Sequence, residues 1–122
     1  MITALVIDDT RLMADILCQL LNLFEIDAQP AYGSRAAMLA LRDTIPDIIF
    51  VDINMPGVSG IEVISYLRRE QHLEDVPVIV VTSDDSKETY KKALQVGALD
   101  VIIKPVSLDI LDTVLKKAHI IT

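Results

Sequence analysis

Two kinds of apolar pattern alternate along the chain. Short continuous runs of aliphatic residues are typical of strands buried on both faces of a sheet, whereas apolar residues spaced three and four positions apart are typical of amphipathic helices. Runs of the first kind predict four strands, at Ile2–Ile7, Ile48–Val51, Val76–Val81 and Val101–Ile103, and a weaker strand, bounded by Pro30 and Gly33, is predicted at Ile26–Ala31.

Helical spacing follows each of these runs. Residues suited to capping a helix N-terminus precede four of the expected helices, namely Thr10, Ser34, Ser86 and Ser107, and the remaining helix is expected near Ser59–Glu70. Gly97 is expected to end the helix that begins after Ser86. The inward faces of these helices are expected to include Leu12, Met13 and Ile16 in the first, Tyr90 in the fourth and Leu108 in the last.

Strict alternation of strand and helix predicts an α/β fold with a parallel sheet covered by helices on both faces. Right-handed crossovers then bring the C-terminal ends of all strands to the same edge of the sheet. Ligands of such folds bind at that edge. The functional residues are therefore to be sought directly after the apolar runs.

Composition narrows the class of protein. A chain of 122 residues is the size of one domain, and its net charge of −7 disfavours direct nucleic-acid binding. The one cysteine, Cys18, excludes an internal disulfide and a thiolate metal cage, and its place in a helical apolar stripe favours a core role. No secretion signal or membrane-spanning run is present, so we expect a cytoplasmic protein that does not contact membrane.

Polar groups of complementary chemistry follow four of the apolar runs. Asp8 and Asp9 follow the first, Asp52 the third, Thr82 the fourth and Lys104 the fifth. Each has an ordinary alternative interpretation as a capping or strand-end residue, but together they would place three carboxylates, a hydroxyl and an ammonium at one edge. Carboxylates suit Mg²⁺, and a cation with a lysine and a hydroxyl can neutralise a phosphoryl group. Asp52 is then a candidate nucleophile that would form an acyl phosphate.

These motifs, in this order, resemble the receiver domains of two-component response regulators over essentially the whole chain. The matching residues are Asp8-Asp9, Asp52, Met55-Pro56-Gly57, Gly60, Thr82-Ser83, Gly97-Ala98 and Lys104-Pro105. The resemblance implies a flavodoxin-like (βα)5 three-layer sandwich with strand order 2-1-3-4-5. We expect residues 1–122 to form a single receiver domain, with no output domain in this chain.

The resemblance also implies a role for each residue. Asp52 would be the phosphoacceptor, with Thr82 as the switch hydroxyl and Lys104 as the partner of the phosphoryl group. Asp9, Asp52 and the main-chain carbonyl of Asn54 would bind Mg²⁺ directly, and Asp8 mainly through water. The Lys104–Pro105 peptide bond would be cis. The phosphoryl donor would be a sensor histidine kinase or a histidine phosphotransfer protein.

One position departs from the family pattern. Many receivers carry an aromatic residue three positions before the lysine, where this chain has Val101. The usual coupling of the threonine to that aromatic residue cannot operate, and signalling would instead pass through the loop after Thr82 and the helix that begins near Ser86, or would be weak. The resemblance also implies that the positions of Asn54 and Asp84 tune water access to the phosphoryl group. Both residues are compact and polar here, which predicts a short-lived phosphorylated state that bulky apolar replacements should prolong.

The leading hypothesis is a phosphorylation-controlled switch, a phosphoacceptor rather than an enzyme. It would regulate contacts with a downstream protein partner, an output domain or a second copy of the chain. One alternative is a receiver-like interaction module that phosphorylation does not control, which Val101 favours slightly. Another is an aspartyl-nucleophile phosphohydrolase, disfavoured because the chain lacks an Asp-x-Asp after its first strand. His72 and His119 join no metal or nucleophile pattern and are expected on the surface.

Overall fold

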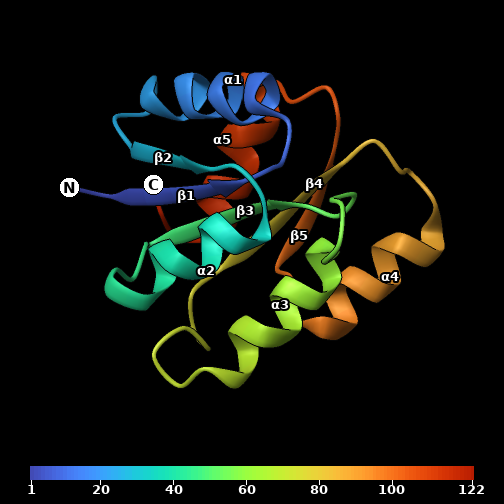
Figure 1. Ribbon diagram of the computed structural model, residues 1–122. Coiled ribbons are helices and arrows are strands. Elements are labelled where there is room, and N and C mark those ends of the chain that lie inside the picture. Colours follow the sequence, from blue (N-terminus) through green and yellow to red (C-terminus); the bar gives the residue numbers. More distant parts are fainter.

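The computed structural model describes residues 1–122, which form one parallel sheet between two layers of helices (Figure 1). The strands lie in the order β2-β1-β3-β4-β5, all neighbours being parallel. The bounds are Thr3–Ile7 for β1, Asp27–Ala31 for β2, Ile48–Asp52 for β3, Val78–Thr82 for β4 and Asp100–Ile103 for β5. The predicted flavodoxin-like fold and strand order are therefore confirmed.

One helix follows each strand. The bounds are Arg11–Asn22 for α1, Ser34–Asp43 for α2, Gly60–Arg69 for α3, Lys87–Val96 for α4 and Leu108–Lys117 for α5. Helices α1 and α5 cover one face of the sheet, and α2, α3 and α4 cover the other (Figure 1). None of the helices has the length and hydrophobicity that a crossing of the lipid bilayer requires.

Side-chain alternation along the strands divides the interior into two cores. In β1, Ala4 and Val6 face the layer of α1 and α5, whereas Leu5 and Ile7 face the opposite layer. The central strand β3 is buried along its whole length. Continuous apolar runs therefore became buried strands because both faces of this sheet are covered.

The expected caps are only partly confirmed. Ser86 and Ser107 accept hydrogen bonds from the backbone amides of Thr89 and Ile110, as N-caps do. Ser34 was expected to be a cap, but it is the first residue of α2 and Gly33 occupies the cap position with a φ of +108°. That backbone conformation favours glycine. Thr10 stands at the cap position of α1, but its side chain makes no capping hydrogen bond.

Several residues expected in the core lie at the surface. Tyr90 is 43% exposed and Leu108 is 44% exposed, so both expectations were wrong. The apolar residues Leu12, Met13 and Ile16 of α1 are also exposed. These helices bury a narrower face than the apolar spacing suggested. The buried residues of α1 are Ala14, Leu17, Cys18 and Leu21, and in α4 Ala93 alone is buried.

The remaining single residues behave as expected. Cys18 is buried in the core beneath α1, as a small hydrophobic residue would be. His72 and His119 are exposed. Gly97 ends α4 in the left-handed conformation, with a φ of +114°.

Candidate functional site

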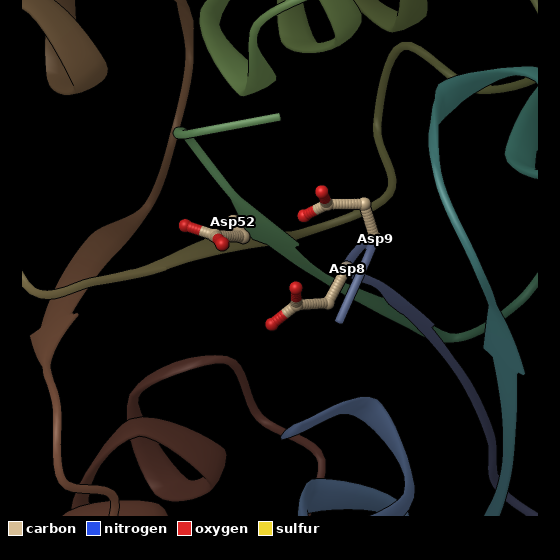
Figure 2. Close-up of side chains that lie close together, drawn as sticks. All are labelled: Asp8, Asp9 and Asp52. Carbon is tan, nitrogen blue, oxygen red and sulfur yellow. The ribbon is translucent and has the colours of Figure 1, made fainter. Parts of the chain in front are cut away.

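The polar residues singled out from the sequence meet at the C-terminal edge of the sheet. Asp52 is the last residue of β3, Thr82 the last of β4, and Asp8 directly follows β1. The strand register keeps these ends level, since Asp52 pairs with Val81 and Thr82 pairs with Ile103. Asp8 and Asp9 extend their carboxylates toward the side on which Asp52 lies (Figure 2).

Three carboxylates form the centre of the site. One oxygen from each of Asp8, Asp9 and Asp52 lies within 4.8 Å of the others. Asp8 and Asp52 are buried, whereas Asp9 is exposed. A cluster of this kind holds repelling negative charges together, and a divalent cation with oxygen ligands would relieve that repulsion. The three residues are therefore able to bind a metal ion.

Lys104 supplies a positive charge to the same cluster. Its Nζ lies 3.4 Å from an oxygen of Asp8 and 3.5 Å from an oxygen of Asp52. Its backbone amide donates a 2.8 Å hydrogen bond to the carbonyl of Thr82, which ties the end of β5 to the end of β4. The following bond, Lys104–Pro105, is cis as expected.

Backbone amides orient two of the carboxylates. Asp8 Oδ1 accepts a 2.9 Å hydrogen bond from the amide of Thr10, and Asp52 Oδ1 accepts one of 3.2 Å from the amide of Asn54. Each acid thus fixes the start of the loop that follows it. The Asn54 side chain is exposed, and the role of its main-chain carbonyl as a metal ligand stays a prediction.

Burial dominates the electrostatics of Asp52. Loss of solvent raises the pKa of its carboxyl group above the ordinary value, and the negative charge of Asp8 adds to the increase. Lys104 and the amide of Asn54 act in the opposite direction and only partly offset it. Burial therefore makes the ionised form of Asp52 less favourable than it would be in water. Perturbed pKa values of this kind are common at functional sites.

Thr82 is fully buried at the end of β4. Its Oγ1 accepts a 3.1 Å hydrogen bond from the amide of Asp84. The carboxylate of Asp84 in turn accepts hydrogen bonds from the amide of Ser86 and the hydroxyl of Thr89. The effect of Asp84 on water access to the site stays a prediction.

Gly60 is needed because α3 begins directly against the strand that carries Asp52. A Cβ atom at Gly60 would collide with the carbonyl oxygen of Asp52 and would lie 2.8 Å from the Cα of Ile53. The amide of Gly60 also donates a 3.0 Å hydrogen bond to the carbonyl of Ile53. The absent side chain therefore lets α3 support the backbone of Asp52.

A cavity of about 430 Å³ opens beside the carboxylates. Its polar lining includes Asp8, Asp52 and Lys104, and most of the remaining lining is apolar. Met13 and Ile16 contribute from α1, and Pro105 and Val106 from the segment before α5. The site therefore has an apolar wall on the side of α1.

A parallel (βα)5 sheet with this acidic cluster and lysine at its C-terminal edge defines a receiver-type domain. Residues 4–116 match the response regulator receiver domain family. The chain therefore belongs to that family, as the sequence motifs indicated.

Relatives of known identity agree with this assignment. The chain is 31% identical over 105 residues to the phosphate regulon transcriptional regulatory protein PhoB of Pseudomonas aeruginosa, covering 86% of this chain and 46% of PhoB. It is 36% identical over 107 residues to protein-glutamate methylesterase/protein-glutamine glutaminase 1 of Dechloromonas aromatica, covering 83% of this chain and 29% of that protein. The chain thus spans less than half the length of these relatives.

Solved structures show the same fold. The chemotaxis protein CheY4 of Vibrio cholerae superposes with a TM-score of 0.90 at 24% identity, covering 97% of this chain and 98% of CheY4. The response regulator TrrA of Thermotoga maritima, in complex with Mg²⁺ and BeF, gives a TM-score of 0.85 at 24% identity, covering 97% of this chain and 99% of the TrrA chain. The receiver domain of Francisella response regulator 1452 gives a TM-score of 0.87 at 27% identity, covering 98% of this chain and 97% of that domain.

Sequence reasoning missed one feature, which lies at the edge of the sheet opposite to the site. Arg68 of α3 extends its guanidinium group to the C-terminal end of α4 and to the loop before β4. A single arginine near the end of a helix carries no signal of its partners, since all of them are backbone carbonyls. Only the folded chain brings those carbonyls around it.

Proposed function

We propose that the chain is a phosphorylation-dependent signalling switch in which Asp52 accepts a phosphoryl group from a phosphohistidine. The donor would be a sensor histidine kinase or a histidine phosphotransfer protein of the cytoplasm. The observation that carries the proposal is the meeting of Asp8, Asp9, Asp52 and Lys104 at one sheet edge. Membership of the receiver family supports it.

The donor set fits Mg²⁺. Asp8, Asp9 and Asp52 offer carboxylate oxygens within 4.8 Å of one another, and the main-chain carbonyl of Asn54 would add a neutral oxygen. Mg²⁺ prefers such oxygen ligands and retains several waters. When bound, it would neutralise negative charge on the transferring phosphoryl group. We propose Asp9, Asp52 and the Asn54 carbonyl as direct ligands, with Asp8 acting mainly through water.

The chemical step transfers one phosphoryl group. A carboxylate oxygen of Asp52 attacks phosphorus, the new P–O bond forms, and the P–N bond to the donor imidazole breaks. The bonding electrons stay on the imidazole nitrogen, and no oxidant or reductant is required. Asp52 becomes an acyl phosphate. Lys104, already 3.5 Å from Asp52, would pair with a phosphoryl oxygen, and the hydroxyl of Thr82 would donate to another.

The transfer would change protein contacts rather than turn over a substrate. A doubly charged group that binds Lys104 and Thr82 can bias two conformations separated by a few kcal/mol. Val101 is only partly buried and lies in β5, an edge strand of the sheet. The change would therefore reach the surface through the loop after Thr82, where a downstream partner, an output domain or a second copy would bind.

The test is reaction with acetyl phosphate in the presence of Mg²⁺, followed by intact-mass measurement. The wild-type protein should gain the mass of one phosphoryl group, and Asp52→Asn should not. Asp43→Asn is the matched control, because Asp43 is an exposed acid at the end of α2 and is not a member of the cluster. Omitting Mg²⁺ should slow the reaction strongly.

The two alternatives give different results. An interaction module that phosphorylation does not control would show no mass gain in the wild-type protein and no change with beryllofluoride. A phosphohydrolase would release inorganic phosphate from an external phosphomonoester over many turnovers. Either result would overturn the proposed function.

A further inference from the structure

The cavity beside the carboxylates extends into the hydrophobic core on the face of the sheet that α1 and α5 cover (Figure 1). Its volume of about 430 Å³ lies within the range that small-molecule ligands occupy. Phe50 of β3 and Val81 of β4 line it from the sheet, and Leu17 lines it from α1. These three residues belong to one core cluster. The cavity therefore joins an apolar interior to the polar edge of the sheet.

Part of the cavity wall consists of apolar side chains that the fold leaves uncovered. Met13 and Ile16 are each 41% exposed, and both line the cavity from α1. Val106 lines it from the segment before α5. Covering apolar surface of this kind with a hydrocarbon group is favourable, because it removes that surface from water. The apolar part of the cavity therefore suits a hydrocarbon group.

The polar end of the cavity has more hydrogen-bond acceptors than donors. Asp8 and Asp52, which are 5% and 7% exposed, line this end together with Lys104. A carboxylate can accept about four hydrogen bonds, whereas an ammonium group donates three and accepts none. Asp8 accepts from one backbone amide and from one ammonium group, and Asp52 accepts from one backbone amide. Acceptor capacity therefore remains unused with Lys104 in place.

The charges at this end favour a further cation. Nζ of Lys104 lies 3.4 Å from Asp8 and 3.5 Å from Asp52, which is long for hydrogen bonds between charged groups. Asp9, the third carboxylate of the cluster, forms no ion pair. A ligand with a cationic N–H donor would supply both the missing charge and the missing donors. An anionic head group would have only Lys104 as a partner and would meet three carboxylates.

We propose that this cavity binds a small amphiphilic primary ammonium compound. Its ammonium group donates hydrogen bonds to the carboxylates of Asp8 and Asp52 at the polar end. Its hydrocarbon part lies between α1 and the sheet, where it covers Met13 and Ile16. Each half of the ligand thus meets a surface of matching chemistry.

A ligand in this position would also regulate the site. It uses carboxylate oxygens that Mg²⁺ requires, so the two cations exclude each other. It also covers Asp52, so it would keep the domain in its unphosphorylated state. This regulatory consequence rests on the proposed function, whereas binding of the ammonium compound does not.

Binding is tested on the full chain with n-octylammonium chloride as the probe, at concentrations well below those at which it forms micelles. Titration followed by amide chemical shifts gives both the dissociation constant and the place of binding. The amide signals of Met13, Ser83 and Val106, which line the cavity, should shift. That of Leu39, an exposed residue of α2 on the opposite face of the sheet, should not.

Three related probes separate the contributions of the head group and the tail. n-Octanol and octanoate carry the same hydrocarbon chain with a neutral and an anionic head group, and each should bind at least about tenfold more weakly. n-Butylammonium keeps the head group but buries less apolar surface, so it should also bind at least about tenfold more weakly. Tighter binding of octanoate would show that Lys104 recognises the ligand. Equal binding of octanol or of butylammonium would show that one half of the ligand contributes nothing, and each of these results would overturn the proposal.

Variants of α1 test the apolar wall. Ile16→Asn should weaken octylammonium binding about tenfold, because it replaces apolar surface that the ligand covers. Leu12→Asn is the matched control, since Leu12 is a 64% exposed residue of the same helix that does not line the cavity. If Ile16→Asn does not fold, Met13→Gln makes the same test with little change in side-chain size. Equal losses in the cavity variant and in Leu12→Asn would place the probe on the outer surface of α1 and contradict the proposal.

Variants of the carboxylates test the polar end. Asp52→Asn should weaken octylammonium binding about tenfold, since it removes a charged acceptor, whereas Asp43→Asn should not change it. Mg²⁺ should raise the apparent dissociation constant of octylammonium. If Asp52→Asn binds the probe as tightly as the wild-type protein does, the head group does not lie at the cluster and the proposal is wrong.

Reaction with acetyl phosphate separates this inference from the proposed function. Saturating octylammonium should slow the mass gain of the wild-type protein about tenfold or more. If the wild-type protein gains no mass even without octylammonium, the proposed function falls, and the ammonium site stands or falls on the binding measurements alone. If the protein gains mass at the same rate with and without bound octylammonium, the ligand does not cover Asp52 and its proposed position is wrong.

Discussion

Nζ of Lys104 lies 3.5 Å from Asp52, although β3, which ends in Asp52, does not pair with β5, which Lys104 directly follows. β4 lies between β3 and β5 in the sheet. The hydrogen bond from the Lys104 amide to the carbonyl of Thr82 holds the lysine next to the C-terminal end of β4, from which its side chain reaches Asp52. In the absence of a metal ion, the ammonium group is the main counter-charge of the acidic cluster.

Replacing Lys104 with methionine should therefore weaken the fold and strengthen cation binding. Removing one partner of a mostly buried ion pair leaves unbalanced carboxylates, so the free energy of unfolding without Mg²⁺ should fall by about 2 kcal/mol. Because the competing ammonium is gone, Mg²⁺ should raise the thermal midpoint of Lys104→Met more than that of the wild-type protein. Thermal unfolding with a chelator and with Mg²⁺ measures both effects.

Lys117→Met provides the control for that experiment. Its ammonium group lies 3.2 Å from Asp100, in a pair that is much more exposed to solvent. An exposed pair contributes about 0–1 kcal/mol, and it is remote from the cluster, so the response to Mg²⁺ should not change. An equal loss of stability in both variants would contradict the central position given to Lys104.

The raised pKa of Asp52 predicts how stability depends on pH. Burial raises this pKa in the folded protein, so the ionised carboxylate destabilises the fold at neutral pH. Asp52→Asn should raise the thermal midpoint by a few degrees at pH 7 in a chelator. That advantage should shrink as the pH falls through the folded-state pKa of Asp52 and disappear below the unfolded value of about 3.9.

Addition of Mg²⁺ should reverse the order of the two proteins at pH 7, because only the wild-type protein keeps the full set of carboxylates. Asp43→Asn should match the wild-type protein at every pH. If the thermal midpoint of Asp52→Asn in a chelator is lower than that of the wild-type protein, the attraction of Lys104 stabilises the ionised Asp52 more than burial destabilises it.

Gly60 should tolerate no side chain. Gly60→Ala places a methyl group against the backbone of Asp52 and Ile53, and the required shift should destabilise the protein by about 2–3 kcal/mol. Because the same shift displaces Asp52, reaction with acetyl phosphate should also slow. Chemical denaturation and intact-mass kinetics measure the two effects.

Gly57→Asn is the matched substitution for that test. Gly57 has a φ of +83°, but nothing lies within 4 Å of the position of an added Cβ atom. Asparagine visits the left-handed region more readily than most residues, so the loss of stability should stay below about 1 kcal/mol. Comparable damage from both substitutions would indicate that loop conformation, rather than contact with β3, requires glycine.

The thiol of Cys18 should be unreactive in the folded protein. Burial, with a smaller contribution from the charge of Asp15, raises the pKa of this thiol to about 11. Almost no thiolate therefore exists at pH 8, and the side chain is also inaccessible. Iodoacetamide should leave the native protein unlabelled and should label it fully after denaturation. Rapid labelling under native conditions would show that α1 separates readily from the sheet.

The sequence predicted the sheet and the site with few errors because both depend on local patterns. Every expected strand is present within two residues of its predicted ends. Asp8, Asp9, Asp52, Thr82 and Lys104 do meet at one edge, since parallel topology brings strand ends together whatever fills the interior. Their chemical roles stay predictions.

Errors arose where burial depends on how one element lies on another. Tyr90 and Leu108 have the spacing of inward residues, but their helices touch the sheet along narrower lines than the spacing suggests. Ser34 has the chemistry of a cap, but Gly33 has the positive φ that the chain requires there. Local pattern identifies the apolar side of a helix and does not reveal how much of that side the neighbours cover.

The alternation of apolar runs and helical stripes by itself determined the (βα)5 architecture, because side chains must be buried with the period of the element that carries them. Only the tertiary structure decided that Asp8 is buried while Asp9 is exposed, that one lysine serves both Asp8 and Asp52, and that Arg68 gathers carbonyls from two segments, the loop before β4 and the end of α4. Such features depend on distances between segments remote in sequence. Those distances are set by the packing of whole helices against the sheet, which no single stretch of the chain encodes.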